Sequence, residues 1–175
     1  QSWQKFKAKR RKSIFAMAEE WVKLDPRREA RAVTGLAPPD NLYKEFEASF
    51  EYEETADQQR AIDDTLAGMQ AKKPMDRLVC GDVGYGKTEV AMRAAFLAVE
   101  GGKQVAVLAP TTILAQQHLQ TFRHRFRNHP VRIEMVSRFL TSKEIAAVLQ
   151  DSAKGVVDII IGTHRLLQKD VEFKD

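Results

Sequence analysis

Apolar runs of strand length alternate with amphipathic stretches over most of the chain. Strands are predicted at 77–80, 104–109, 131–136 and 156–161. Between the runs, apolar residues recur three and four positions apart, as do Ile62, Leu66 and Met69, which is the spacing of a helix face. Short strands alternating with helices are typical of an α/β fold, in which helices cover both faces of a parallel sheet.

Helix start and stop signals agree with this order. Thr55-Ala56-Asp57-Gln58 and Thr141-Ser142-Lys143-Glu144 both have the form of a capping box, so a helix is predicted to open at each. Gly101-Gly102 ends an Ala/Leu-rich helix predicted over 89–99. A further helix follows Pro110, because Leu114, His118, Phe122 and Phe126 stand at helical spacing.

The N-terminal part differs in character from the rest. An apolar stripe predicts one long helix over 2–24, and Pro38-Pro39 breaks any helix that would follow. We therefore predict a connecting helical segment at 1–33, a linker at 34–45 and a globular domain at 46–175. Residues 1–31 hold ten Lys or Arg and four Asp or Glu, a net +6 in a chain of net +4. The basic helix either contacts nucleic acid or a partner, or is a solvated face, and the second interpretation is favoured.

Composition narrows the class of protein. The chain has 175 residues, and its 43% hydrophobic content is enough for a packed core. Cys80 is the single cysteine, which excludes an intrachain disulfide, and its place in a predicted strand indicates inert core packing. No apolar run is long enough to span a membrane and no signal peptide is seen, so a cytosolic protein without membrane contact is expected.

The stretch that carries chemistry is Gly81-Asp82-Val83-Gly84-Tyr85-Gly86-Lys87-Thr88, which matches the P-loop pattern G-x-x-x-x-G-K-[ST]. Its glycines let backbone amides point at one phosphate, and Lys87 can reach the β- and γ-phosphates. The Thr88 hydroxyl can ligate Mg²⁺. The order of predicted strand, loop and helix is the context that a P-loop needs, so ATP and Mg²⁺ are the expected cofactors.

Polar side chains also follow the other predicted strands. Ligands of open α/β sheets bind at the carboxyl ends of the strands, and hydroxyls, amides and arginines there can donate to a nucleic-acid backbone. The candidates for such contacts are Thr111, Thr112, Gln116, Arg138, Thr163 and His164. The alternative for Thr111 is an ordinary helix cap, and for Thr163 an ordinary turn.

With these stretches assembled, the sequence resembles the RecG-like group of superfamily 2 translocases. The stretch Met75–Ala91 is similar to motif I, Ala109–His118 to motif Ia, and Ile161–His164 to motif Ib. Within that group, Val131–Phe139 and Gly162–Gln168 are closest to the bacterial transcription-repair coupling factors. The resemblance covers about residues 46–175, and it implies a RecA-like P-loop domain containing part of a motor lobe's parallel sheet, preceded by the basic helix.

The resemblance gives Thr55 and Gln58 a second interpretation. They match the Q-motif position, where a glutamine reads the adenine, and Tyr52 or Phe50 could stack on the base. Capping of the helix by the same two residues competes for the Gln58 amide, and the sequence leaves both interpretations open.

A Walker B acid at the end of a strand is missing, because none of the four predicted strands ends in a carboxylate and Asp158 stands at the start of its strand. The family places that acid and the second lobe beyond Asp175, so the chain resembles a truncated piece that we expect to hydrolyse no ATP alone. The full enzyme, by resemblance, walks on double-stranded DNA and displaces stalled RNA polymerase in transcription-coupled repair. The alternatives are a fork-remodelling helicase of the RecG type and a non-catalytic binding module with a relic P-loop.

Overall fold

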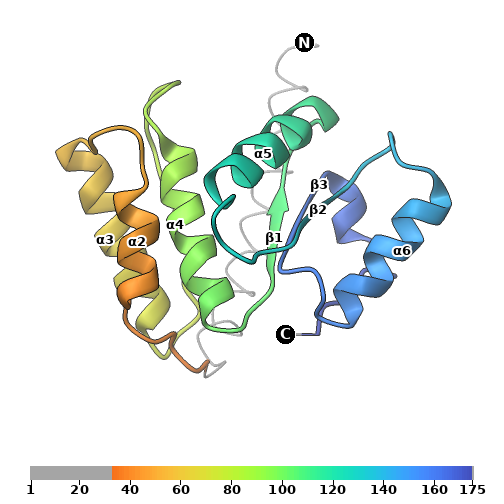
Figure 1. The fold of residues 1–175 in the computed structure, drawn as a ribbon, viewed down its shortest axis with the longest axis horizontal. Helices are drawn as coiled ribbons and strands as arrows, with labels where there is room; N and C mark the ends of the chain where they lie inside the picture. Colours follow the sequence, from red (N-terminus) through yellow and green to blue (C-terminus); the bar gives the residue numbers. More distant parts are fainter. Residues whose placement is uncertain (1–32, 175) are drawn as a thin grey trace, which may run out of the picture.

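The computed structural model describes residues 33–174, and the helix predicted over 2–24 lies outside them, as does nearly all of the predicted connecting segment. The elements follow one another in the α/β order that the sequence predicts (Figure 1). They are α2 (Asn41–Ala48), α3 (Ala56–Gln70), α4 (Lys87–Glu100), β1 (Val105–Leu108), α5 (Thr112–Arg125), β2 (Ile133–Val136), α6 (Ser142–Ala153), β3 (Ile159–Gly162) and the 3₁₀ helix η1 (His164–Leu167). None of the described helices is long and apolar enough to cross a membrane.

The described strands form one parallel sheet in the order β1-β3-β2. Gly162 of β3 lies level with Leu108 of β1 and with Val136 of β2, so the three strands end at the same edge. β3 is the central strand, and it is buried along its whole length because neighbours pair with both of its sides. An apolar run such as Ile159–Gly162 is typical of a parallel strand that is covered on both faces.

Alternate residues of β3 face two separate apolar clusters. Ile159 and Ile161 belong to the larger cluster, which includes α3, α4 and α5, whereas Ile160 packs with Leu149 of α6 and Leu166 of η1. Successive side chains of a strand point to opposite faces, so the two clusters lie on opposite faces of the sheet. Figure 1 shows α2, α3 and α4 grouped at one side of the sheet and α6 at the other.

The strand predicted over 77–80 does not form. These residues pair with no strand among those described, and Leu78 is 86% exposed. Cys80 is exposed too, so its predicted place in the core is wrong. The physical reason is that a strand is stabilised by pairing with a neighbouring strand, and an apolar sequence alone does not provide that neighbour.

Helix α2 begins inside the stretch that the sequence assigned to a linker. Asp40 caps it by accepting hydrogen bonds from the amides of Leu42 (2.7 Å) and Tyr43 (3.2 Å). Phe46 of this helix is fully buried and stacks on Phe96 of α4 at 4.2 Å between ring centroids. The predicted linker of 34–45 therefore ends earlier than expected, and an Asp just after Pro38-Pro39 is the sequence signal that marks the helix start.

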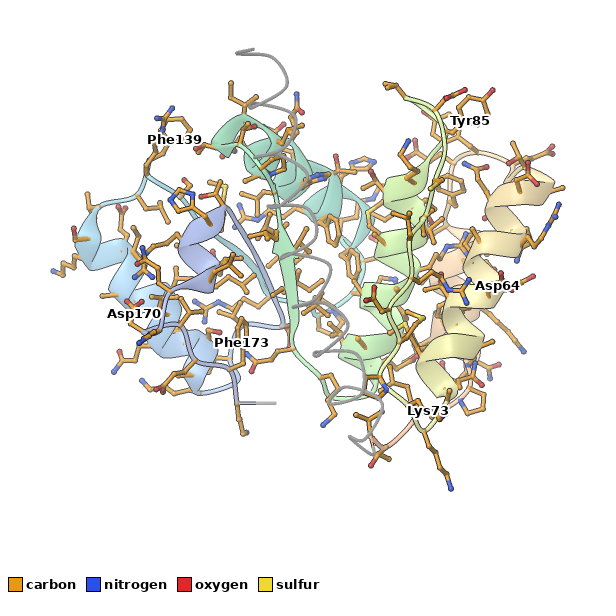
Figure 2. The ribbon with its side chains drawn as sticks, turned by 180° about the vertical axis from the view of Figure 1, so that it is seen from behind. Asp64, Lys73, Tyr85, Phe139, Asp170 and Phe173 are labelled. Atoms are coloured by element: carbon orange, nitrogen blue, oxygen red, sulfur yellow. The ribbon has the colours of Figure 1, made fainter. Side chains whose placement is uncertain are left out.

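The fold gathers loops at one end of the molecule. In Figure 2, Tyr85 at the tip of the P-loop and Phe139 in the loop after β2 lie at the same end, with Lys73 at the opposite one. That end carries the carboxyl ends of the strands, where ligands of open α/β sheets bind.

Candidate nucleotide-binding site

The P-loop approaches α4 through two glycines in the left-handed region. Gly84 has φ +87° and Gly86, the residue before the helix, has φ +65°. A Cβ on Gly86 would lie only 2.2 Å from Nε2 of Gln58. A side chain at this position would be strained by the backbone conformation, and it would also displace the Gln58 amide from the loop.

The first turn of α4 presents positively polarised groups to the loop. Gly86 provides no side-chain cap, so no side chain of the preceding residue covers the amides there. Lys87 is half-buried, and its Nζ donates to the backbone oxygens of Gly81 (2.7 Å) and Asp82 (2.5 Å). The ammonium therefore lies against the backbone of the loop.

A cavity of about 610 Å³ opens between the P-loop and the segment before α3. One wall is the P-loop with Thr88, Glu89 and Met92 of α4, and the other carries aromatic and polar side chains of residues 50–58. The members of this second wall are Phe50, Tyr52, Glu53, Thr55 and Gln58. Tyr52 is 73% exposed and meets Phe50 edge-on at 5.6 Å between ring centroids, so both aromatic side chains border the open site.

Gln58 serves both walls of the cavity. Its side-chain Oε1 accepts from the backbone amide of Thr55 (2.7 Å), and its backbone amide donates to Thr55 Oγ1 (3.2 Å). These two bonds confirm the predicted capping box. Its Nε2 donates to the backbone oxygen of Tyr85 in the P-loop (3.0 Å). The two interpretations were expected to compete, yet one amide group closes the cap with its oxygen and contacts the loop with its nitrogen. Reading of a base by Gln58 stays a prediction.

Replacing Gln58 by alanine is expected to weaken ATP binding more than GTP binding if this amide reads the base. Loss of the cap alone costs about 0.5–2 kcal/mol of stability and leaves base preference unchanged. Dissociation constants for both nucleotides, measured beside a melting curve, separate the roles. Glu144→Ala is the matched control, because Glu144 is the equivalent residue of the capping box of α6. A lowered melting temperature with an unchanged ATP/GTP ratio would contradict base reading.

Behind the cavity lies a buried ion network that the sequence did not reveal. Arg93 of α4 is completely buried, and its Nε donates to Glu89 (2.6 Å) while its Nη1 donates to Glu47 (2.7 Å). Its Nη2 donates to Glu54. Burial alone would lower the pKa of Arg93, but the hydrogen bond and charge of Glu89 outweigh it, and the pKa rises. The arginine is thus held fully charged among three carboxylates.

Arg125 of α5 closes the network from the other side. It donates to both carboxylate oxygens of Glu89, through Nε (3.1 Å to Oε2) and Nη2 (2.8 Å to Oε1). Its guanidinium also lies 3.9 Å from the ring centre of Phe46. Glu89 follows the P-loop threonine directly, so both arginines are fixed to the first turns of the nucleotide-facing helix. A sequence signal existed, namely an acid and an arginine four residues apart inside an otherwise apolar helix.

The candidates for nucleic-acid contact come together at the carboxyl edge of the sheet, but with different exposure. Thr111 is exposed and caps α5 by accepting from the Leu114 amide (3.2 Å). Arg138 and His164 are also exposed, whereas Thr112 and Gln116 are half-buried. Thr163 is buried, with 9% of its surface exposed, so its side chain is less available to a ligand than the sequence suggested.

Acidic groups at this edge are scarce. None of the three described strands ends in a carboxylate, and Asp158, which precedes β3, accepts from the Arg132 amide at the other end (2.7 Å). Among residues 33–174, no cluster of three or more His, Cys, Asp or Glu side chains could hold a metal ion. Thr88 lines the P-loop cavity, and its hydroxyl is of the kind that can ligate Mg²⁺.

Comparison with known proteins decides the family. Residues 55–175 match the family described as DEAD/DEAH box helicase. The chain belongs to the DEAD/DEAH box helicase family. Membership in this helicase family implies a nucleotide site, and the matched residues include the P-loop together with Thr55 and Gln58 of the facing wall.

The chain is about half identical to proteins named Transcription-repair-coupling factor. It is 50% identical over 173 residues to that of Bacillus subtilis (strain 168) and 51% over 174 residues to that of Escherichia coli (strain K12). Each match covers 99% of this chain and 15% of the relative. The resemblance to this group seen in the motifs is confirmed, and the chain spans about 15% of the length of these curated relatives.

Solved structures agree on the fold. A structure titled RecG bound to three-way DNA junction superposes with a TM-score of 0.81 at 35% identity, covering 87% of this chain and 21% of that one. A hypothetical ATP-dependent RNA helicase from Sulfolobus tokodaii gives a TM-score of 0.56 at 21% identity, covering 77% of this chain and 38% of that one. The helicase-family chain therefore has the predicted RecA-like α/β fold.

Proposed function

We propose that this helicase-family chain is the ATP-binding part of an ATP-dependent translocase on double-stranded DNA. The observation that carries the proposal is the P-loop cavity. The uncapped N-terminus of α4 forms its anion-binding side, Lys87 lies beside it against the loop, and Gln58 and Tyr52 stand opposite as candidates for the base. Amides, an ammonium and a hydroxyl are the donor set that a triphosphate with Mg²⁺ requires.

The P-loop residues contact different parts of the bound nucleotide. The amides of the loop from Gly81 to Gly86 cradle phosphate, Lys87 contacts the β- and γ-phosphates, and Thr88 ligates Mg²⁺. The metal, when bound, neutralises charge between the phosphates. Because none of the described strands ends in a carboxylate, the proposal assigns ATP hydrolysis to the full-length protein.

The biological role rests on similarity. The relatives are named Transcription-repair-coupling factor and are 50–51% identical to this chain, whereas the RecG structure is 35% identical. We therefore favour displacement of stalled RNA polymerase during DNA repair over fork remodelling of the RecG type. ATP-dependent transcript release from a stalled polymerase by the full-length protein supports this role. Regression of a forked DNA without such release would favour the alternative.

Contact with duplex DNA is assigned to the exposed carboxyl edge of the sheet, with Thr111 as the first candidate. Thr111→Asp keeps a good cap for α5 but places a negative charge where DNA phosphate would lie. A lost hydrogen bond to a charged group is worth roughly 1.5–3 kcal/mol, so half-maximal stimulation should require about ten- to a hundredfold more DNA.

The measurement is ATP hydrolysis by the full-length protein, with and without duplex DNA. Thr141→Asp, which changes the cap of α6 in the same way, is the matched control. Equal loss of basal and DNA-stimulated hydrolysis in Thr111→Asp would reassign Thr111 to folding. No stimulation of the wild type by duplex DNA would overturn the translocase proposal itself.

A further inference from the structure

The segment that carries the two aromatic residues of the site has open space on both sides. The P-loop cavity lies on one side, and a second cavity of about 290 Å³ lies on the other, between this segment and α5. Phe50, Tyr52, Glu89 and Met92 line both cavities. Apolar packing alone therefore does not hold the segment of residues 49–54 in place, because its side chains contact the core along only part of their surface.

Ionic and polar contacts hold the segment at its two ends. At its start, Ser49 Oγ accepts from Nη1 of Arg125 (2.6 Å). At its end, Glu54 accepts from Nη2 of the fully buried Arg93. Both arginines are bound in turn to Glu89, the residue that follows the P-loop threonine.

The aromatic residues between these anchors lie near the same two cations. The guanidinium of Arg93 lies 5.9 Å from the ring centre of Phe50, and that of Arg125 lies 5.6 Å from it. Phe50 meets Tyr52 edge-on. The position of Tyr52 is thus set through Phe50, through the two anchored ends of the segment, and through Glu51, whose Oε1 lies 3.4 Å from Nε2 of His124.

We propose that Glu54 is a positioning residue of the nucleotide site, which through Arg93 fixes the aromatic segment at the distance from the P-loop that suits a purine base. The inference rests on the proposed nucleotide-binding function. Glu54 touches no ligand in this proposal, because its carboxylate points to the network behind the cavity. Its removal should loosen the hold on the base and leave the phosphate contacts intact.

Glu47 offers a matched control within the same network. It pairs with Arg93 as Glu54 does, and neither carboxylate lines the P-loop cavity, but Glu47 belongs to α2 and not to the segment of residues 49–54. Glu54→Ala and Glu47→Ala each remove one of the three carboxylates around Arg93. A purely structural role predicts similar losses of melting temperature and no difference in ligand binding.

The experiment measures dissociation constants of the 175-residue chain for ATP and for inorganic tripolyphosphate, each with Mg²⁺. Stacking of a base on an aromatic ring is worth roughly tenfold or more in affinity, so Glu54→Ala should bind ATP about tenfold more weakly. Its affinity for tripolyphosphate, which has no base, should equal that of the wild type. Glu47→Ala should bind both ligands as the wild type does.

Two further variants test the same inference. Glu54→Gln can still accept from Arg93 and should regain part of the ATP affinity, while Ser49→Ala loosens the other end and should give a smaller loss of the same selectivity. If Glu54→Ala does not fold, Ser49→Ala decides the question. Equal weakening of ATP and tripolyphosphate, or equal effects of the Glu54 and Glu47 variants, would overturn the inference. Failure of the wild type to bind either ligand would instead overturn the proposed function.

Discussion

Replacing Arg93 by methionine is expected to lower the free energy of unfolding by about 3–5 kcal/mol, because breaking a buried ion pair leaves uncompensated charge in the interior. Methionine fills much of the same volume, so the lost stability reflects the missing positive charge more than an empty cavity. Glu89, whose side chain is 4% exposed, would keep Arg125 as a partner but lose the bond from Nε. At about 2–4 °C per kcal/mol for a chain of this size, the melting temperature should fall by roughly 10 °C.

The control for this prediction is the same substitution at a surface pair. Arg60 pairs with Asp57 at 2.9 Å, and both side chains are mostly exposed, so Arg60→Met should cost well under about 1 kcal/mol. Arg93→Lys should fall between the wild type and Arg93→Met, because an ammonium keeps the charge but cannot span three carboxylates in one plane. Thermal and urea unfolding of the variants measure the difference. A shift of Arg93→Met no larger than that of Arg60→Met would show that the network adds little to stability.

Replacing Lys87 by alanine is expected to remove ATP hydrolysis from the full-length protein and to weaken ATP binding by this chain. Each lost hydrogen bond between an ammonium and phosphate is worth roughly 1.5–3 kcal/mol, or about ten- to a hundredfold in affinity. The fold should persist, because Nζ donates only to the backbone oxygens of Gly81 and Asp82, which belong to exposed loop residues.

Steady-state phosphate release and equilibrium binding of Mg²⁺-ATP test this prediction, with a melting curve to confirm folding. Lys143→Ala is the control, because Lys143 is an exposed lysine of α6 and lies outside the P-loop. Near-wild-type hydrolysis in Lys87→Ala would exclude the P-loop as the catalytic nucleotide site. Equal losses in both lysine variants would indicate a general effect of charge.

Local sequence patterns were sufficient for the elements whose signals are local. The capping boxes at Thr55 and Thr141 form as predicted, and α4 ends at Gly101-Gly102. Three of the four predicted strands lie where the apolar runs stand. A capping box needs residues only three positions apart. A strand that is covered on both faces is apolar along its whole length. Both features can therefore be recognised from the sequence.

Strand pairing and the burial of side chains could not be predicted from local sequence patterns. The apolar run at 77–80 has the pattern of a strand, but a strand forms only with a neighbour, and none of the described residues pairs with it. The prediction of Cys80 in the core failed for the same reason. Conversely, the sequence analysis did not predict α2, because the prolines before Asp40 suggested a linker. This helix is stabilised by the packing of Phe46 on Phe96.

For the candidate site, the sequence by itself determined the P-loop pattern, because this pattern consists of residue types at fixed spacing in one short segment. Only the tertiary structure decided how that loop is supported. Gln58 meets the Tyr85 carbonyl across 27 positions, and Arg93 meets Glu47 and Glu54 across 46 and 39 positions. Contacts of this kind arise when the helices pack against one another, and charged residues that are far apart in the sequence carry no sign of which partner they will meet.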